Sequence, residues 1–61
     1  MTILKEIELI KMQDDNFIII NLVNGNADII KANVAVKLLK SKFELIEEEI
    51  INNLISRKYI F

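Results

Sequence analysis

The 61-residue chain is long enough for one small domain, 1–61, and its net charge of −1 lacks the basic excess of a nucleic-acid-binding domain. Without cysteine or histidine it cannot form disulfides, nucleophile–histidine pairs, or zinc and haem sites of the ordinary type. No apolar run reaches the ~18 residues of a membrane helix, and a single glycine cannot build a phosphate-binding loop.

The first predicted strand lies in the apolar run that ends near Met12. Periodicity alone leaves this run open between helix and strand. The polar cluster Asp14-Asp15-Asn16 follows it, which is typical of a turn between two apolar runs. Because a lone hairpin is barely stable in water, the hairpin that follows needs a neighbour. We therefore predict a strand over about Glu8–Gln13.

The next two strands form a hairpin around Asn24-Gly25, the strongest turn signal in the chain. A type I′ turn needs positive φ at both central residues, which Asn and Gly adopt at least cost. We therefore expect that turn type between strands at Phe17–Val23 and Asp28–Ala32. The short third strand carries a charge on each face, which is a common deterrent to unwanted pairing at a sheet edge.

The second strand is apolar on both faces. One face carries Ile18, Ile20 and Leu22, and the other carries Phe17, Ile19, Asn21 and Val23. A central strand covered by helices on one side, and by the chain's tails or a partner on the other, explains this pattern as ordinary core. If the second face were exposed, it would instead mark a docking surface.

Two helices are predicted after the sheet. Asn33 is a good N-cap residue for a helix over 34–40. The capping box Ser41-Lys42-Phe43-Glu44 then indicates a second helix that ends near Lys58. Its apolar stripe consists of Phe43, Ile46, Ile50, Ile51, Leu54 and Ile55. Because no Gly or Pro interrupts this region, one continuous helix of about 25 residues is the alternative.

The predicted fold class is therefore α+β, with a three-stranded antiparallel β-meander followed by two α-helices in winged-helix-like order. A chain of this size buries only about 60% of its unfolded surface. Its stability is therefore marginal. Because 52% of its residues are hydrophobic, we expect either unusually dense packing or association with another chain to supply the missing stability. A homodimer and membership of a larger enzyme both stay open. A cytoplasmic location is expected, since the N-terminus does not resemble a signal peptide.

This order of elements resembles the RiPP recognition element, or PqqD-like domain, which occurs alone or at the N-terminus of radical-SAM and other peptide-modifying enzymes. The similar segments are the strand Asn16–Asn21, the Asn24-Gly25 turn, the run Asp28–Leu39 and the closing segment Glu47–Phe61. The chain departs from the family in two respects. It has room for two helices after the sheet where the family usually has three, and Lys58 stands where glycine is common.

In that family a leader peptide adds as an extra strand in a groove between the third strand and the last helix. The resemblance implies a peptide-binding site with no metal and no cofactor. Its residues would be Asp28, Ile29, Ile30, Lys31 and Ala32 from the strand, with Ile51, Leu54, Ile55 and Lys58 from the helix. For Ile51 and Leu54, ordinary core packing is the competing explanation.

Two functions follow from these observations. The first is a non-catalytic peptide- or protein-binding module. The second is a small structural or inhibitory protein, for example a phage-encoded one, that oligomerises or occludes a partner protein. A DNA-binding winged helix is the weakest option, because the second helix offers only Arg57 and Lys58 to a phosphate backbone. We expect neither a membrane nor a nucleic acid as a partner.

Overall fold

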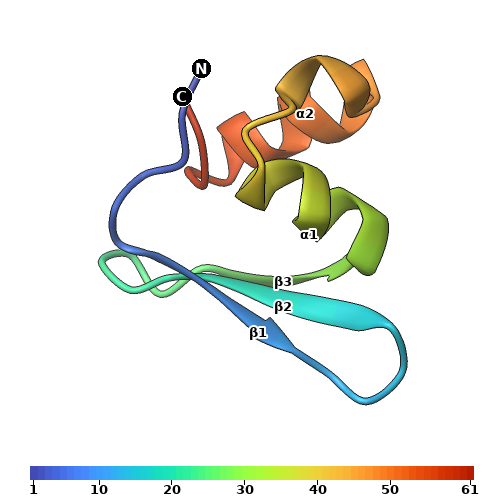
Figure 1. Cartoon of the computed structure of the whole chain (residues 1–61). Coiled ribbons are helices and arrows are strands. Elements are labelled where there is room, and N and C mark those ends of the chain that lie inside the picture. The colour runs from blue at the N-terminus through green and yellow to red at the C-terminus, as the bar shows by residue number, and fades with distance from the viewer.

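The computed structural model describes residues 1–61 and places two α-helices on one face of a three-stranded antiparallel sheet (Figure 1). The elements are β1 (Ile7–Lys11), β2 (Asn16–Asn21), β3 (Ala27–Lys31), α1 (Ala32–Leu39), a 3₁₀ turn η1 (Phe43–Leu45) and α2 (Glu48–Ser56). The predicted α+β order is confirmed, with β2 in the centre of the sheet. The alternative of one continuous helix is wrong.

The two hairpin turns set the ends of the strands. Between β1 and β2, the Met12 amide donates to the Asn16 carbonyl at 2.9 Å, and Asp15 has a φ of 61°. This is the geometry of a three-residue hairpin loop with a left-handed last residue. The first strand therefore ends at Lys11, and the predicted end at Gln13 is wrong because that residue lies in the turn.

The turn between β2 and β3 is a four-residue loop and not the predicted type I′ turn. Asn21 donates through its backbone to the Asn26 carbonyl, and the Gly25 amide donates to the Asn21 carbonyl, both at 2.9 Å. Only Gly25 has positive φ, at 81°, whereas a type I′ turn also requires it at Asn24. β2 consequently ends at Asn21, two residues before the predicted Val23.

The break between the helices lies at Ser41, but Ser41 is not an N-cap. It has a φ of 56°, and the Lys42 and Ser41 amides donate to the Lys37 and Leu38 carbonyls at 2.8 and 3.1 Å. These two bonds form a Schellman motif, so Ser41 closes α1. The capping-box prediction is wrong, and α2 begins only at Glu48.

The start of α1 also differs from the prediction. The helix begins at Ala32 with Lys31 in the extended N-cap position, which has no side-chain cap hydrogen bond. Asn33 therefore lies inside the first turn and is not the N-cap. Because β3 ends at Lys31, strand and helix follow one another without a loop. The third strand is shifted by one residue from the predicted Asp28–Ala32.

α2 ends in a second Schellman motif, and this one turns the chain back into the core. Lys58 has a φ of 69°, and the Tyr59 and Lys58 amides donate to the Leu54 and Ile55 carbonyls at 2.9 and 3.0 Å. Tyr59 and Ile60 are each only 1% exposed. Ile60 forms a β-bridge with Ile3, which brings the two termini together (Figure 1).

The core fills the space between the sheet and the helices. Its largest fully buried side chains are Tyr59, Ile19, Leu38 and Ile60. Neither helix covers the opposite face of the sheet (Figure 1). The two faces of β2 are therefore not equivalent, because Ile19 and Asn21 are buried whereas Ile18 and Ile20 stay partly exposed.

Candidate functional site: a groove between β3 and α2

The outer edge of β3 has no strand beside it, because the sheet order is β1-β2-β3. Two hydrogen bonds show which N–H groups of β3 point toward β2 and which point away from it. The Asn21 amide donates to the Asn26 carbonyl, and the Ala32 amide donates to the Asp15 carbonyl at 3.2 Å. In an antiparallel ladder every second residue bonds the neighbouring strand. The N–H groups of Ala27, Ile29 and Lys31 therefore point outward.

A groove of about 440 Å³ lies between this edge and α2. β3 contributes one wall and α2 the other, and Val34 of α1 and Tyr59 of the C-terminal tail also line the groove. More than half of its lining residues are hydrophobic. The lining residues are Asp28, Ile29, Ile30, Lys31, Val34, Ile50, Asn53, Leu54, Ser56, Arg57 and Tyr59.

On the β3 wall, the predicted residues Asp28, Ile29, Ile30 and Lys31 all line the groove. Ala32, the fifth predicted residue, does not. It opens α1, and its amide is used in the hydrogen bond to the Asp15 carbonyl. The strand half of the predicted site is thus brought together by the structure, apart from this last position.

On the α2 wall, the groove is lined by a different set of positions from the predicted one. Of the predicted Ile51, Leu54, Ile55 and Lys58, only Leu54 lines it. Ile51 is buried in the core, Ile55 is 40% exposed outside the groove, and Lys58 lies beyond the helix.

The groove is lined by Ile50, Asn53, Leu54 and Ser56 of α2 and by the C-cap residue Arg57. All of these except Ser56 follow the i, i+3, i+4, i+7 spacing of one helix face. The predicted set has the same spacing moved by one residue. One residue is a rotation of about 100° around a helix with 3.6 residues per turn. The apolar stripe predicted from the sequence contained Ile50 and Leu54, so it included residues of the face that lines the groove. The stripe also covered the adjacent face, and the sequence alone did not distinguish the two.

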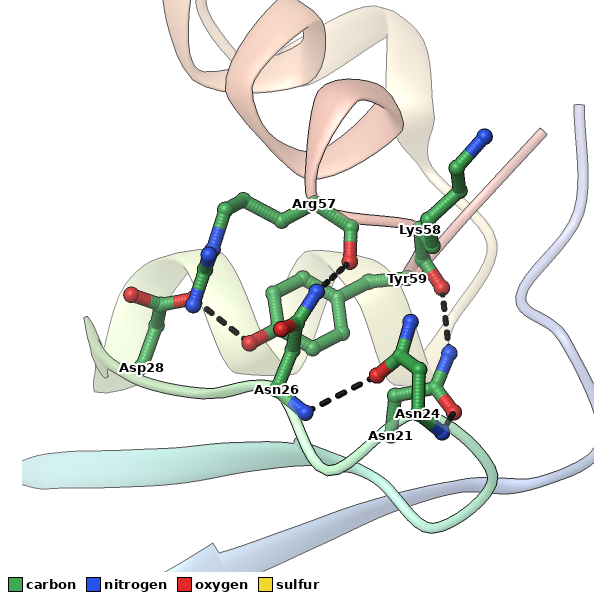
Figure 2. A network of polar contacts seen from close by, with 7 residues as sticks. All are labelled: Asn21, Asn24, Asn26, Asp28, Arg57, Lys58 and Tyr59. Carbon is green, nitrogen blue, oxygen red and sulfur yellow. Dashed lines mark hydrogen bonds and ion pairs between the residues drawn. The ribbon is translucent and has the colours of Figure 1, made fainter.

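Three of the lining residues, Asp28, Arg57 and Tyr59, form a polar cluster (Figure 2). Arg57 donates through Nε to Asp28 Oδ2 at 2.8 Å, and the Tyr59 hydroxyl donates to the same oxygen at 2.5 Å. Burial, and then the bond to Asp28, raise the pKa of Tyr59 to about 12. The Tyr59 hydroxyl, and then the Arg57 guanidinium, hold the pKa of Asp28 below its usual value.

Two asparagines join the end of α2 to the hairpin loop (Figure 2). Asn26 donates through Nδ2 to the Arg57 carbonyl at 3.0 Å, and Asn21 donates through Nδ2 to the Lys58 carbonyl at 2.8 Å. The last turn of a helix leaves carbonyls without intrahelical partners, and these amides bind carbonyls just beyond that turn. The contacts fix how far α2 lies from β3, and so they set the width of the groove.

The groove combines a hydrogen-bonded carboxylate with apolar lining residues. Its one carboxylate is engaged by Arg57 and Tyr59, and no group of three or more Asp or Glu side chains gathers where a metal ion would fit. An apolar floor beside a row of outward N–H groups suits an extended chain, whose backbone pairs with the edge while alternate side chains enter the groove.

No family model, curated protein or solved structure matches this chain in the comparisons with known proteins. No helix in the structure has the length and apolar character that crossing a lipid bilayer requires.

Proposed function

We propose that the chain is a non-catalytic module that binds an extended segment of a partner peptide or protein along the outer edge of β3. The observation that carries the proposal is that the groove runs beside a sheet edge with free N–H groups. Main-chain pairing with Ala27, Ile29 and Lys31 would supply affinity, and the apolar floor would select side chains.

The groove also restricts the ligand. Alternate side chains of an extended segment point to opposite faces, so only every second residue would reach the floor formed by Ile30, Val34 and Leu54. The ligand is therefore an extended segment with apolar residues at alternate positions. The resemblance to the RiPP recognition element favours a leader-type peptide as that segment, and a cytoplasmic location accords with such a partner.

The edge can be tested without disturbing the fold, because Lys31 has a φ of −73°, close to the value that proline imposes. Linear peptides are selected from a display library on the immobilised wild-type protein, and their affinities are then compared for Lys31→Pro and Lys31→Ala. Lys31→Pro removes both the charge and the outward N–H, whereas Lys31→Ala removes the charge alone. We expect at least a tenfold loss for the first and a much smaller change for the second.

The helix wall offers a second matched pair. Asn52 and Asn53 are adjacent exposed residues of α2, but only Asn53 lines the groove. Asn53→Trp should fill the groove and abolish binding, while Asn52→Trp should leave it unchanged. Peptides that bind both tryptophan variants equally, or that bind Lys31→Pro as well as Lys31→Ala, would show that binding occurs elsewhere.

A further inference from the structure

The face of the sheet that the helices leave uncovered carries a continuous apolar row. Ile10, Ile18 and Ile29 lie directly across from one another on the three strands. Ile10 is 48% exposed and Ile29 is 63% exposed, although both are large aliphatic side chains. Ile20, two residues from Ile18 on the same face of β2, enlarges this apolar surface. An exposed apolar surface of this kind marks a contact site.

Two opposite charges stand at opposite corners of this face. Glu8 shares a cross-strand row with Ile20 and is one row away from Ile18 on one side. Lys31 pairs with Asn16, one row away on the other side and on the opposite outer strand. Strands lie about 4.8 Å apart and rows on one face about 6.7 Å apart, so both charges are roughly 8 Å from Ile18, along one diagonal.

We propose that this face binds a second copy of the chain, with the two sheets stacked face to face and their strands crossing at about a right angle. The two-fold axis lies parallel to the sheets, passes beside Ile18 and runs perpendicular to the line that joins Glu8 to Lys31. It therefore places Glu8 of each copy over Lys31 of the other. Orthogonal stacking of two sheets is an established packing mode.

The other simple orientations do not achieve this pairing. An axis parallel to the strands sets Glu8 against the row position of Ala27, and an axis perpendicular to them sets it against that of Met12. An axis along the diagonal through the charges opposes Glu8 to Glu8 and Lys31 to Lys31. Like charges in an interface disfavour that arrangement. The charge pattern thus selects one self-complementary geometry, and the outer edge of β3 stays free in it.

The first test is the mass in solution, by sedimentation equilibrium from micromolar to millimolar concentration. We expect association to twice the chain mass of 7.1 kDa. Ile29→Glu should weaken the dimer at least tenfold. Leu39→Glu is the matched control, because Leu39 is also 63% exposed but lies on α1, away from this face. Circular dichroism verifies that both variants are folded.

The second test exchanges the charges. Glu8→Lys and Lys31→Glu should each weaken the homodimer, since each opposes like charges across the interface. An equimolar mixture of the two variants should form a heterodimer, because every pair is then of opposite sign. The double variant should also regain the wild-type affinity.

A wild-type mass of 7.1 kDa at every concentration would overturn the proposal. So would a dimer that Ile29→Glu leaves intact, or single charge variants that fail to associate more tightly when mixed. Slow hydrogen exchange at the Ile29 and Lys31 amides that appears only in the dimer would also overturn it, because edge-to-edge pairing would then be the contact.

Discussion

The Nδ2 of Asn21 lies 2.8 Å from the carbonyl oxygen of Lys58, 37 residues further along the chain. Asn21 is only 3% exposed, and its Oδ1 accepts from the amides of Val23 and Asn24 at 2.9 and 3.1 Å. One side chain therefore shapes the hairpin loop and holds the end of α2 beside it. All buried side-chain polar atoms are hydrogen-bonded, which these contacts help to explain.

Asn21→Ala should destabilise the protein by about 2 kcal/mol, because three hydrogen bonds are lost and buried partners are left unpaired. Asn24→Ala is the control. Its side chain makes one bond to the Asn26 amide in an exposed loop, so we expect a loss of less than about 1 kcal/mol. Urea unfolding measures both changes. Equal effects would show that the contact to Lys58 contributes nothing.

Gly25 is the one residue of the loop between β2 and β3 with a positive φ, a conformation that most side chains disfavour. Its φ is 81°, and a Cβ at this position would meet no atom within 4 Å, so any cost of substitution is backbone strain. Gly25→Val should therefore lose about 1–3 kcal/mol, and Gly25→Asn clearly less, since Asn tolerates this region. The melting temperatures of the two variants measure these losses. An unchanged melting temperature for Gly25→Val would show that a side chain at position 25 causes no backbone strain.

Ser41 and Lys58 occupy the left-handed positions of the two Schellman motifs, where glycine is usual. Ser41→Gly and Lys58→Gly should each stabilise the protein by about 0.5–1 kcal/mol, because a side chain in this conformation costs roughly 1–2 kcal/mol. Glu44→Gly lies in η1 and serves as a control that should not stabilise. A loss of stability in Ser41→Gly would restore Ser41 as a helix N-cap.

We expect the Tyr59 hydroxyl to lose its proton at a higher pH than an ordinary tyrosine. Because Tyr59 is the only tyrosine, the phenolate absorbance of the protein reports this residue alone. With a pKa raised to about 12, its contribution to stability is complete below pH 10 and lost as the pH rises through 12. Asp28→Asn should lower the midpoint part of the way, since burial is the larger cause. A wild-type midpoint near the ordinary value of 10.0 would contradict the contact.

The lowered pKa of Asp28 acts at the other end of the pH scale. Its contribution is present above the ordinary value of 3.8 and is lost as the pH falls through the lower folded value. The stability difference between wild type and Asp28→Asn should therefore shrink in acid. Urea unfolding at neutral and acid pH measures it, and a difference that grows in acid would exclude the proposed pairing.

The second and third strands followed from apolar runs on either side of a turn signal, which are local features of the sequence. The first strand followed from the need of a lone hairpin for a neighbouring strand. The type of the second turn did not follow, since it depends on Asn21 bonding the loop and α2 together. Ser41 broke the helix as predicted, but through a left-handed conformation for which serine gives no sequence signal. Helix ends of this kind are usually recognised by glycine.

On the strand wall the predicted residues line the groove except for Ala32, and on the helix wall the predicted set is displaced by one residue. The apolar stripe of α2 was broad enough to include both Ile50 and Ile51. Packing against the sheet decides which of them faces the core, and that is a tertiary choice. The pairing of Asp28 with Arg57 and Tyr59 was likewise invisible, because it joins residues about thirty positions apart.

The most direct test of the groove is an amide-shift titration of the isotope-labelled protein with a library-selected peptide, and then with candidate leader peptides. We predict shifts and slowed exchange at Ala27, Ile29 and Lys31, together with shifts along Asn53–Arg57. The amides that already bond β2, such as that of Ile30, should keep their exchange rates. Shifts confined to Met1–Val23, or unchanged exchange at Ile29 and Lys31 in the saturated complex, would contradict the account.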